Sequence, residues 1–182
     1  MKYFALLFLF TLFAVSGLRA DDNPPDDFAD VKWGESADAA KAKVLLKPGT
    51  KFTAASPDGA NLIFEGGTFA TFPATRWEFH FATNQFTKGS VNLTPTDTSM
   101  ASLRRAYESL NKSITKKYRK AGLEEHDGPT HSAMYWTFNT RKGNWQIACD
   151  VDARRNGVRL VYSFSPSLKP GSQAAGTPKK DL

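Results

Sequence analysis

Three groups of charged side chains contain the residue types that catalysis or metal binding requires. The first is Asp150 and Asp152, which alternate along a predicted strand and therefore point to the same face. Two neighbouring carboxylates can act as general acid and general base when their surroundings separate their pKa values. Arg154 and Arg155 follow directly, so a strand-end cluster of ion pairs is the alternative interpretation. A calcium loop does not fit, because these arginines occupy positions that need an oxygen ligand and a glycine.

His80 is the second candidate. It lies on a predicted strand that begins at Arg76, and alternation places it on one polar face with Arg76 and Glu78. A single histidine on such a face is usually a surface residue. Combined with Asp150 and Asp152, however, it supplies the acid–base groups of a hydrolase. The chain contains no hydrolase elbow, phosphate loop, zinc-protease pair or dinucleotide fingerprint, so we predict no catalytic residue and no cofactor.

The third group is a loop rich in carboxylates and imidazoles. Imidazole and carboxylate together can hold a transition metal ion. The loop contains Glu124, Glu125, His126, Asp127 and His131. Because a Gly-Pro pair separates the two histidines, the segment fixes no coordination geometry, and an ordinary polar loop is the alternative. We predict no metal site and keep His126 and His131 as the candidate ligands of a metal-binding alternative.

One long amphipathic helix, predicted from Thr98 to Ala121, organises the chain around these groups. Its apolar residues recur at gaps of three and four, which follow one face of a helix. They are Met100, Leu103, Tyr107, Leu110, Ile114, Tyr118 and Ala121. Asp97 or Thr98 can cap its first amides, and Gly122 can end it. The apolar stripe requires a sheet to cover it.

The opposite side of this predicted helix is basic. Five cations fall within an arc of roughly 100° on a helical wheel. We call them the basic surface: Arg105, Lys112, Lys116, Arg119 and Lys120. Glu108 is the only acidic residue of the predicted helix. The basic surface either keeps the protein soluble or binds an anionic protein, a polyanion or a membrane surface. Nucleic acid is not an expected partner, since the N-terminus indicates export.

Residues 1–20 have the pattern of an export signal. Lys2 supplies a positive start, an apolar run extends from Tyr3 to Val15, and small residues precede Ala20. The apolar run is shorter than the roughly 20 residues of a spanning helix. We therefore predict cleavage after Ala20 and a periplasmic or extracellular protein, with an uncleaved N-terminal anchor as the alternative.

Composition divides the rest of the chain into three segments. Asp-rich residues 21–27, with two prolines, predict a disordered acidic leader, and Pro- and Gly-rich residues 165–182 predict a flexible tail. Residues 28–164 are long enough for a single domain with its own core. Cys149 is the only cysteine, which excludes an internal disulfide. Since it alternates with apolar neighbours, we expect it in the core.

The predicted domain belongs to the α+β class. Clean alternation of apolar and polar residues predicts strands over 76–82, 145–152 and 158–164. We predict a largely antiparallel curved sheet built from two helix-plus-three-strand units, 28–96 and 97–164, with the helices packed on one face. The sequence leaves open whether the two units share one sheet or form two, and whether the protein is a monomer.

The opening segment from Phe28 to Ser36, FADVKWGES, runs directly into a predicted helix. It resembles the start of small exported bacterial proteins of uncharacterised function, in which an aromatic-Gly-x-Ser turn joins a first strand to a first helix. The resemblance covers about twenty residues and implies a bacterial origin and an α+β fold. It implies no catalytic residue. In physical terms, Trp33 fills the junction, Gly34 permits the bend and Ser36 caps the helix.

Three functions are consistent with these observations. An exported, non-enzymatic binding protein of the bacterial envelope or exterior accounts for the signal, the basic surface and the absence of a catalytic motif. Repeated helix-and-sheet units also resemble the layout of exported inhibitors that present a concave sheet to a partner, which is a likeness of fold only. A hydrolase with an unrecognised carboxylate and histidine site is the first alternative, and a metal-binding protein is the second.

Overall fold

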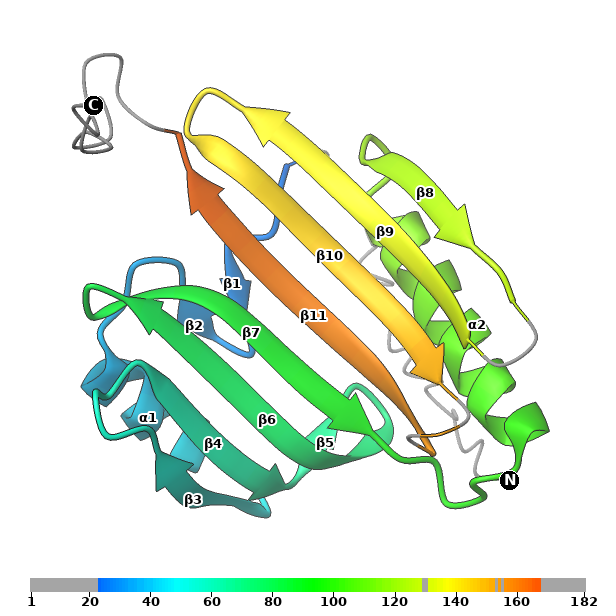
Figure 1. The fold of residues 1–182 in the computed structure, drawn as a ribbon, viewed down its shortest axis with the longest axis horizontal. Coiled ribbons are helices and arrows are strands. Elements are labelled where there is room, and N and C mark those ends of the chain that lie inside the picture. The colour runs from blue at the N-terminus through cyan, green and yellow to red at the C-terminus, as the bar shows by residue number, and fades with distance from the viewer. Residues whose placement is uncertain (1–22, 129–130, 153, 155, 168–182) are drawn as a thin grey trace, which may run out of the picture.

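A single antiparallel sheet of nine strands forms the centre of the molecule (Figure 1). The computed structural model describes residues 23–128, 131–152, 154 and 156–167, so the predicted signal peptide and residues 168–182 of the predicted tail lie outside the described residues. Eight strands follow one another in the order β3-β4-β6-β7-β11-β10-β9-β8, and β5 pairs with β6. The strands are β3 Thr50–Ala55, β4 Asn61–Gly66, β5 Thr68–Phe69, β6 Phe72–Ala82, β7 Gln85–Leu93, β8 Gly122–His126, β9 His131–Thr140, β10 Gly143–Asp152 and β11 Gly157–Pro166.

The two halves of the chain meet at the pairing of β7 with β11. This antiparallel pairing runs from Val158 opposite Leu93 to Ser163 opposite Lys88. After β7, the helix α2 (Met100–Lys117) carries the chain to the far edge, and β8 to β11 return strand by strand to the centre. The predicted pair of helix-plus-three-strand units is therefore wrong: each helix is followed by four strands of the path, and all of them belong to one sheet.

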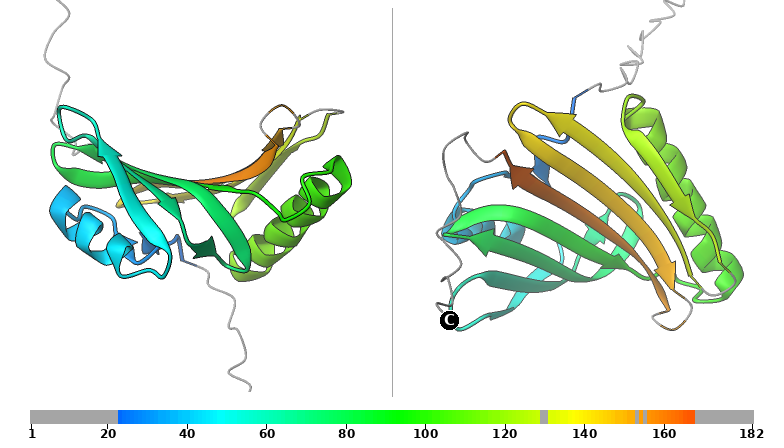
Figure 2. Two further views of the ribbon diagram at one scale, coloured as in Figure 1. Left: turned by 90° about the horizontal axis from the view of Figure 1, so that it is seen from below. Right: turned by 45° about the horizontal axis from the view of Figure 1, so that its top comes forward.

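One face of the sheet is covered by three elements (Figure 2). These are the helix α1 (Ala37–Leu45), the helix α2 and a small hairpin of β1 (Asp27–Phe28) with β2 (Val31–Lys32). Phe28 of the hairpin lies against the aromatic rings of Phe79 and Tyr162, at centroid distances of 5.5 and 5.3 Å. Each fully buried side chain of this size contributes about 1.5–3 kcal/mol through its removal from water. We call this side the covered face and the opposite side the open face.

Helix α2 packs its predicted apolar stripe against β10 and β11. Leu103, Tyr107, Leu110 and Ile114 are buried, which confirms most of the stripe, although Met100 is 37% exposed. The hydroxyl of Ser99, rather than Asp97 or Thr98, caps the helix by accepting a hydrogen bond from the Ser102 amide. No helix in the described part of the chain is both long and apolar enough to cross a membrane.

The helix also ends earlier than its predicted limit at Ala121. Tyr118 has φ −115° and ψ 67°, outside helical geometry, and follows the last helical residue, Lys117. Gly122 does not terminate α2 but begins β8, where it pairs with Thr137 of β9. Residues 118–121, which helical periodicity assigned to the helix, instead form the turn that leads into the edge strand β8.

The segment around Trp33 fixes the start of the domain to β7. The Trp33 ring stacks on Phe86 at a centroid distance of 5.0 Å, and its indole N–H donates to the Pro25 carbonyl at 2.6 Å. Gly34 has φ +84°, a conformation that favours glycine, and its amide donates to the Phe86 carbonyl. Ser36 caps α1, as the sequence predicts. Pro25 is buried and β1 begins at residue 27, so part of the expected leader belongs to the folded domain.

Candidate functional site

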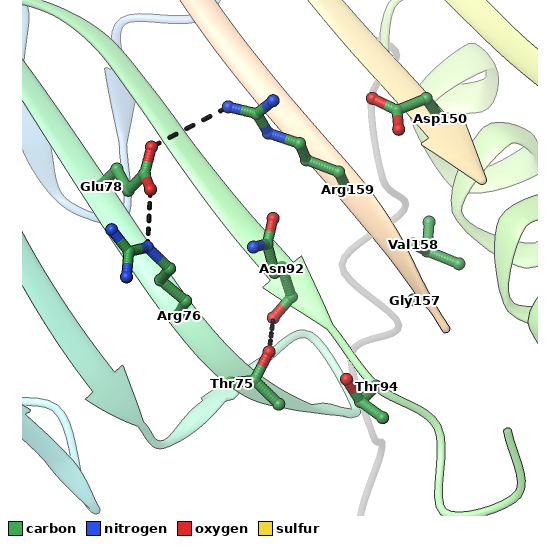
Figure 3. A pocket seen from close by; sticks show the side chains of 9 residues that line it. All are labelled: Thr75, Arg76, Glu78, Asn92, Thr94, Asp150, Gly157, Val158 and Arg159. Carbon is green, nitrogen blue, oxygen red and sulfur yellow. Dashed lines mark hydrogen bonds and ion pairs between the residues drawn. The ribbon is translucent and has the colours of Figure 1, made fainter. Parts of the chain in front are cut away.

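A hollow of about 300 Å³ lies on the open face, where β6, β7, β11 and β10 run side by side (Figure 3). Polar and charged side chains make up most of its wall. The lining residues are Thr75, Arg76, Glu78, Asn92, Thr94, Asp150, Gly157, Val158 and Arg159. A second hollow of about 260 Å³ adjoins it and shares Arg76 and Glu78. The described residues thus place a charged, indented region near the middle of the sheet.

Strand alternation and register bring these side chains together. In β6 the aromatic residues point to the covered face, so Arg76, Glu78 and His80 point to the open face. Register then aligns four strands, because Arg76 pairs with Asn92, Asn92 with Arg159, and Arg159 with Asp150. A bulge in β6 at Thr75 lets its hydroxyl donate to the Asn92 carbonyl at 3.2 Å.

Glu78 interacts with both arginines of the hollow. The Nε of Arg76 donates a hydrogen bond to one carboxylate oxygen of Glu78 at 2.6 Å, and Nη2 of Arg159 lies 3.9 Å from the other. Burial by itself raises the pKa of Glu78, but the hydrogen bond and charge of Arg76, with the charge of Arg159, outweigh burial and hold this pKa below its ordinary value. Glu78 is therefore ionised at neutral pH and orients the two guanidinium groups.

His80 lies beside this carboxylate without a hydrogen bond to it. Its Nε2 is 3.7 Å from a carboxylate oxygen of Glu78, and this nitrogen is buried with no hydrogen-bond partner in the described part of the chain. Burial and the positive charge of Lys88 lower the pKa of His80, although Glu78 opposes the shift. The imidazole is therefore neutral at physiological pH.

The residues of the hydrolase alternative are not brought together. The register places Asp150 three strands from Arg76, and His80 is four residues further along β6, so their Cα atoms are roughly 20 Å apart. Asp152 is buried and receives hydrogen bonds from the backbone and side chain of Arg154 at 2.9–3.2 Å. Arg155 lies outside the described residues. The arrangement matches the ion-pair interpretation of Asp152, not a shared acid–base site.

The two candidate metal ligands lie on strands. His126 ends β8, which also contains Glu124 and Glu125, and His131 begins β9, so the prediction that these residues share one loop is wrong and only Asp127 lies outside a strand. The His126 ring contacts Glu124 at 2.8 Å and both side chains are exposed. Within the described residues, no group of three or more His, Cys, Asp or Glu side chains is arranged to hold a metal ion. Cys149 is buried in the core, and this burial raises the pKa of its thiol.

The basic surface lies on the side of α2 that faces away from the sheet. Its five residues are all exposed, but only the first three belong to α2; Arg119 and Lys120 follow the helix. The Arg105 guanidinium donates to the hydroxyl of Ser102 at 2.6 Å. Because α2 covers the opposite side of the sheet, the basic surface and the hollow are separate (Figure 2).

Sequence reasoning missed Asn92 and Arg159 as members of this site. The alternation of Val158, Leu160 and Tyr162 does place Arg159 on the face opposite the core. It does not reveal that β7 is the neighbour of β11, which depends on the pairing of segments distant in the sequence.

Comparisons with known proteins identify no relative. No protein-family model matches the chain, and neither a curated protein nor a solved structure matches it.

Proposed function

We propose that this protein is an exported binding protein without enzymatic activity, and that its ligand occupies the open face of the sheet around the hollow. One observation carries the proposal. The covered face is packed under α1, α2 and the β1–β2 hairpin, whereas no helix or strand of the described chain lies over the open face (Figure 2). Export is supported by the signal pattern of residues 1–20.

The side chains of the open face suit contact with a ligand. Ser90, Val161 and Ala148 are in register across the centre of the sheet and form its floor, where Ser90 is buried and the short side chains of Val161 and Ala148 are half-buried. Charged groups of the hollow lie beside this floor. A floor of small side chains lets a ligand approach the strands closely, and polar groups at the border can fix its orientation.

A capture experiment with one bulky substitution tests the proposal. Ala148→Trp places a large ring on the central floor, while Ala39→Trp places the same ring on the exposed surface of α1. Each purified variant and the native protein serve as bait for envelope and secreted extracts of the producing cell. We expect native and Ala39→Trp baits to capture the same ligand, and Ala148→Trp to lose it.

Circular dichroism and the melting temperature first establish that both variants are folded. Capture of the same ligand by folded Ala148→Trp would contradict the assignment to the open face. Chemical turnover of a captured small molecule by the native protein would contradict the absence of enzymatic activity.

The basic surface is proposed as a second binding surface, for an anionic protein, a polyanion or a membrane surface. Its support is the exposure of all five cations together with Glu108 as the only acidic residue of α2. If charge alone holds such a partner, added salt should release it, because at 0.1 M ionic strength the interactions of exposed charges are screened beyond about 10 Å.

A further inference from the structure

Arg76 on β6 and Arg159 on β11 both line the hollow, and most of their N–H donors have no hydrogen-bond partner among the described residues. We infer that the hollow binds a carboxylate group of the ligand between these two arginines, which deepens and rests on the proposed binding function of the open face. The inference depends on the donor inventory, the register of the strands and the charges that line the hollow.

A guanidinium has five N–H donors. Arg76 commits its Nε to Glu78, and no other hydrogen bond of its guanidinium is found in the described part of the chain. Arg159 makes none there, since its approach to Glu78 at 3.9 Å is too long for a hydrogen bond. The Arg76 and Arg159 side chains are 42% and 31% exposed, so their remaining donors face solvent and are open to a ligand that replaces water.

Arg76, Asn92 and Arg159 are register partners on three adjacent strands, which puts the two arginine Cα atoms about 10 Å apart with Asn92 between them. Figure 3 shows both guanidinium groups next to Glu78, while Asn92 lies beside the arginine side chains and Thr75 and Thr94 lie further away. A carboxylate that enters from the solvent over Asn92 can meet one guanidinium with each oxygen, as the carboxylate of Glu78 does.

The arginine pair already holds one carboxylate, that of Glu78, which favours a second group of the same kind. Planar carboxylates match the fork of an arginine, and phosphate does so as well. Glu78 and Asp150 balance the charges of the two arginines, so the lining gives a doubly charged phosphate no net electrostatic advantage over a singly charged carboxylate. The volume of about 300 Å³ admits a small acid or one acidic side chain. The shared chemistry is thus a carboxylate, from a free organic acid or from an acidic residue of a protein ligand.

An NMR titration of the full protein with N-acetylglutamate tests this inference, using sodium chloride at equal ionic strength as the reference. We expect saturable shifts at Arg76, Asn92 and Arg159 with a dissociation constant in the range of about 1–10 mM. Arg159→Gln should weaken binding at least about tenfold, since charged hydrogen bonds are lost. Arg141→Gln removes the same charge from the exposed turn between β9 and β10 and should leave the affinity within about twofold, because that turn is far from the hollow.

Folding of Arg159→Gln is checked by circular dichroism and urea unfolding, and Arg76→Gln replaces it if it does not fold. Absence of saturable shifts up to about 50 mM acid, or equal binding by a folded arginine variant, would overturn the inference. Tighter binding of inorganic phosphate than of N-acetylglutamate would overturn the carboxylate assignment.

The source of the carboxylate and the proposed function are tested separately. Release of a captured protein by excess N-acetylglutamate would assign the carboxylate to an acidic residue of that protein, whereas binding of the free acid without such release would assign it to a small organic acid. If Ala148→Trp loses the captured ligand but the native protein binds no carboxylate, this inference is overturned and the proposed function stands. If the native protein binds the carboxylate but Ala148→Trp still captures the same ligand, the proposed function is overturned and this inference stands.

Discussion

Glu78 determines how the charged side chains of the open face are arranged. Its carboxylate interacts with Arg76 through a hydrogen bond, with Arg159 through charge, and lies 3.7 Å from His80. Without it, two guanidinium groups would face one another with no anion between them. The same carboxylate that occupies part of the hollow thus keeps the arginines in place for a second anion.

The pH dependence of stability should report this role of Glu78. Because its pKa is lower in the folded than in the unfolded protein, its stabilisation is complete above the unfolded value of about 4.3 and is lost as pH falls through the folded value. We expect Glu78→Gln to melt at a lower temperature than the native protein at pH 7, and the difference to fade below about pH 4. Glu108→Gln, an exposed change on α2, is the control and should have little effect at pH 7. A melting difference that does not change with pH would contradict this prediction.

Gly89 marks a position where the covered face leaves no room for a side chain. A Cβ atom built there would overlap Cδ1 of Phe28, whose ring is enclosed by other aromatic rings. We expect Gly89→Ala to lower the free energy of unfolding by about 1–3 kcal/mol, since the crowded ring cannot move freely. Urea unfolding measures this, with Ser163→Ala on the open face as the control, expected within about 0.5 kcal/mol of native. An unchanged urea midpoint for Gly89→Ala would show that the hairpin with Phe28 is loosely attached.

At the scale of elements, α2 has two distinct surfaces. Its inner side is buried, and Thr115 accepts a hydrogen bond at 3.1 Å from the indole of Trp136 on β9. Its outer side carries the first three residues of the basic surface. Since Lys112 and Lys116 are exposed, their charge can be reversed with little effect on the fold.

Reversing two of these charges tests the proposed second binding surface. We expect Lys112→Glu combined with Lys116→Glu to elute from an immobilised polyanion such as heparin at a lower salt concentration than the native protein. The control is Arg141→Glu combined with Lys142→Glu, which changes the net charge equally in an exposed turn between β9 and β10. Equal elution of the two variants would mean that only net charge matters and that the basic surface has no special role. Circular dichroism verifies that α2 remains folded.

At the scale of the whole molecule, the pairing of β7 with β11 joins the two halves into one structure. Neither half has a complete sheet without it, because this pairing joins the strands from β3 through β7 to the strands from β8 through β11. Both helices also pack on the same face of that sheet (Figure 2). Unfolding of one half therefore exposes the central strand of the other.

This continuity predicts a single cooperative unfolding transition. In calorimetry we expect one peak, with equal calorimetric and van't Hoff enthalpies. Val161→Pro, in the middle of β11, should lower the free energy of unfolding by about 3 kcal/mol or more, because proline disrupts a ladder with neighbours on both sides. Two separate peaks in the native protein would contradict the single unit.

The sequence predicted the interior of this fold better than its edges. The strands with large alternating side chains, such as β6, β10 and β11, are recognisable because one face of each is buried. The edge strands β3 and β8 were missed, since β8 has no buried residue and β3 contains Phe52 as its only large apolar side chain. Because one edge strand was missed in each half, the prediction has three strands per half where the main path of the sheet has four.

The candidate site could be anticipated only in part. Alternation placed Arg76, Glu78 and His80 on one polar face, which the structure confirms. The partner side chains come from β7 and β11, and pairing between distant segments leaves no signal in residue spacing. His126 was assigned to a loop because charge and exposure gave its strand no apolar pattern.

The division between the two faces of the sheet has an optical consequence. All four tryptophans of the chain belong to the covered side: Trp77, Trp136 and Trp145 are buried there, and Trp33 stacks on Phe86. Intrinsic fluorescence therefore reports on the packing beneath the helices and changes when the protein unfolds. A ligand that settles on the other face quenches none of these indoles by contact, so emission stays constant while binding proceeds, and a tryptophan introduced there would provide a signal of its own.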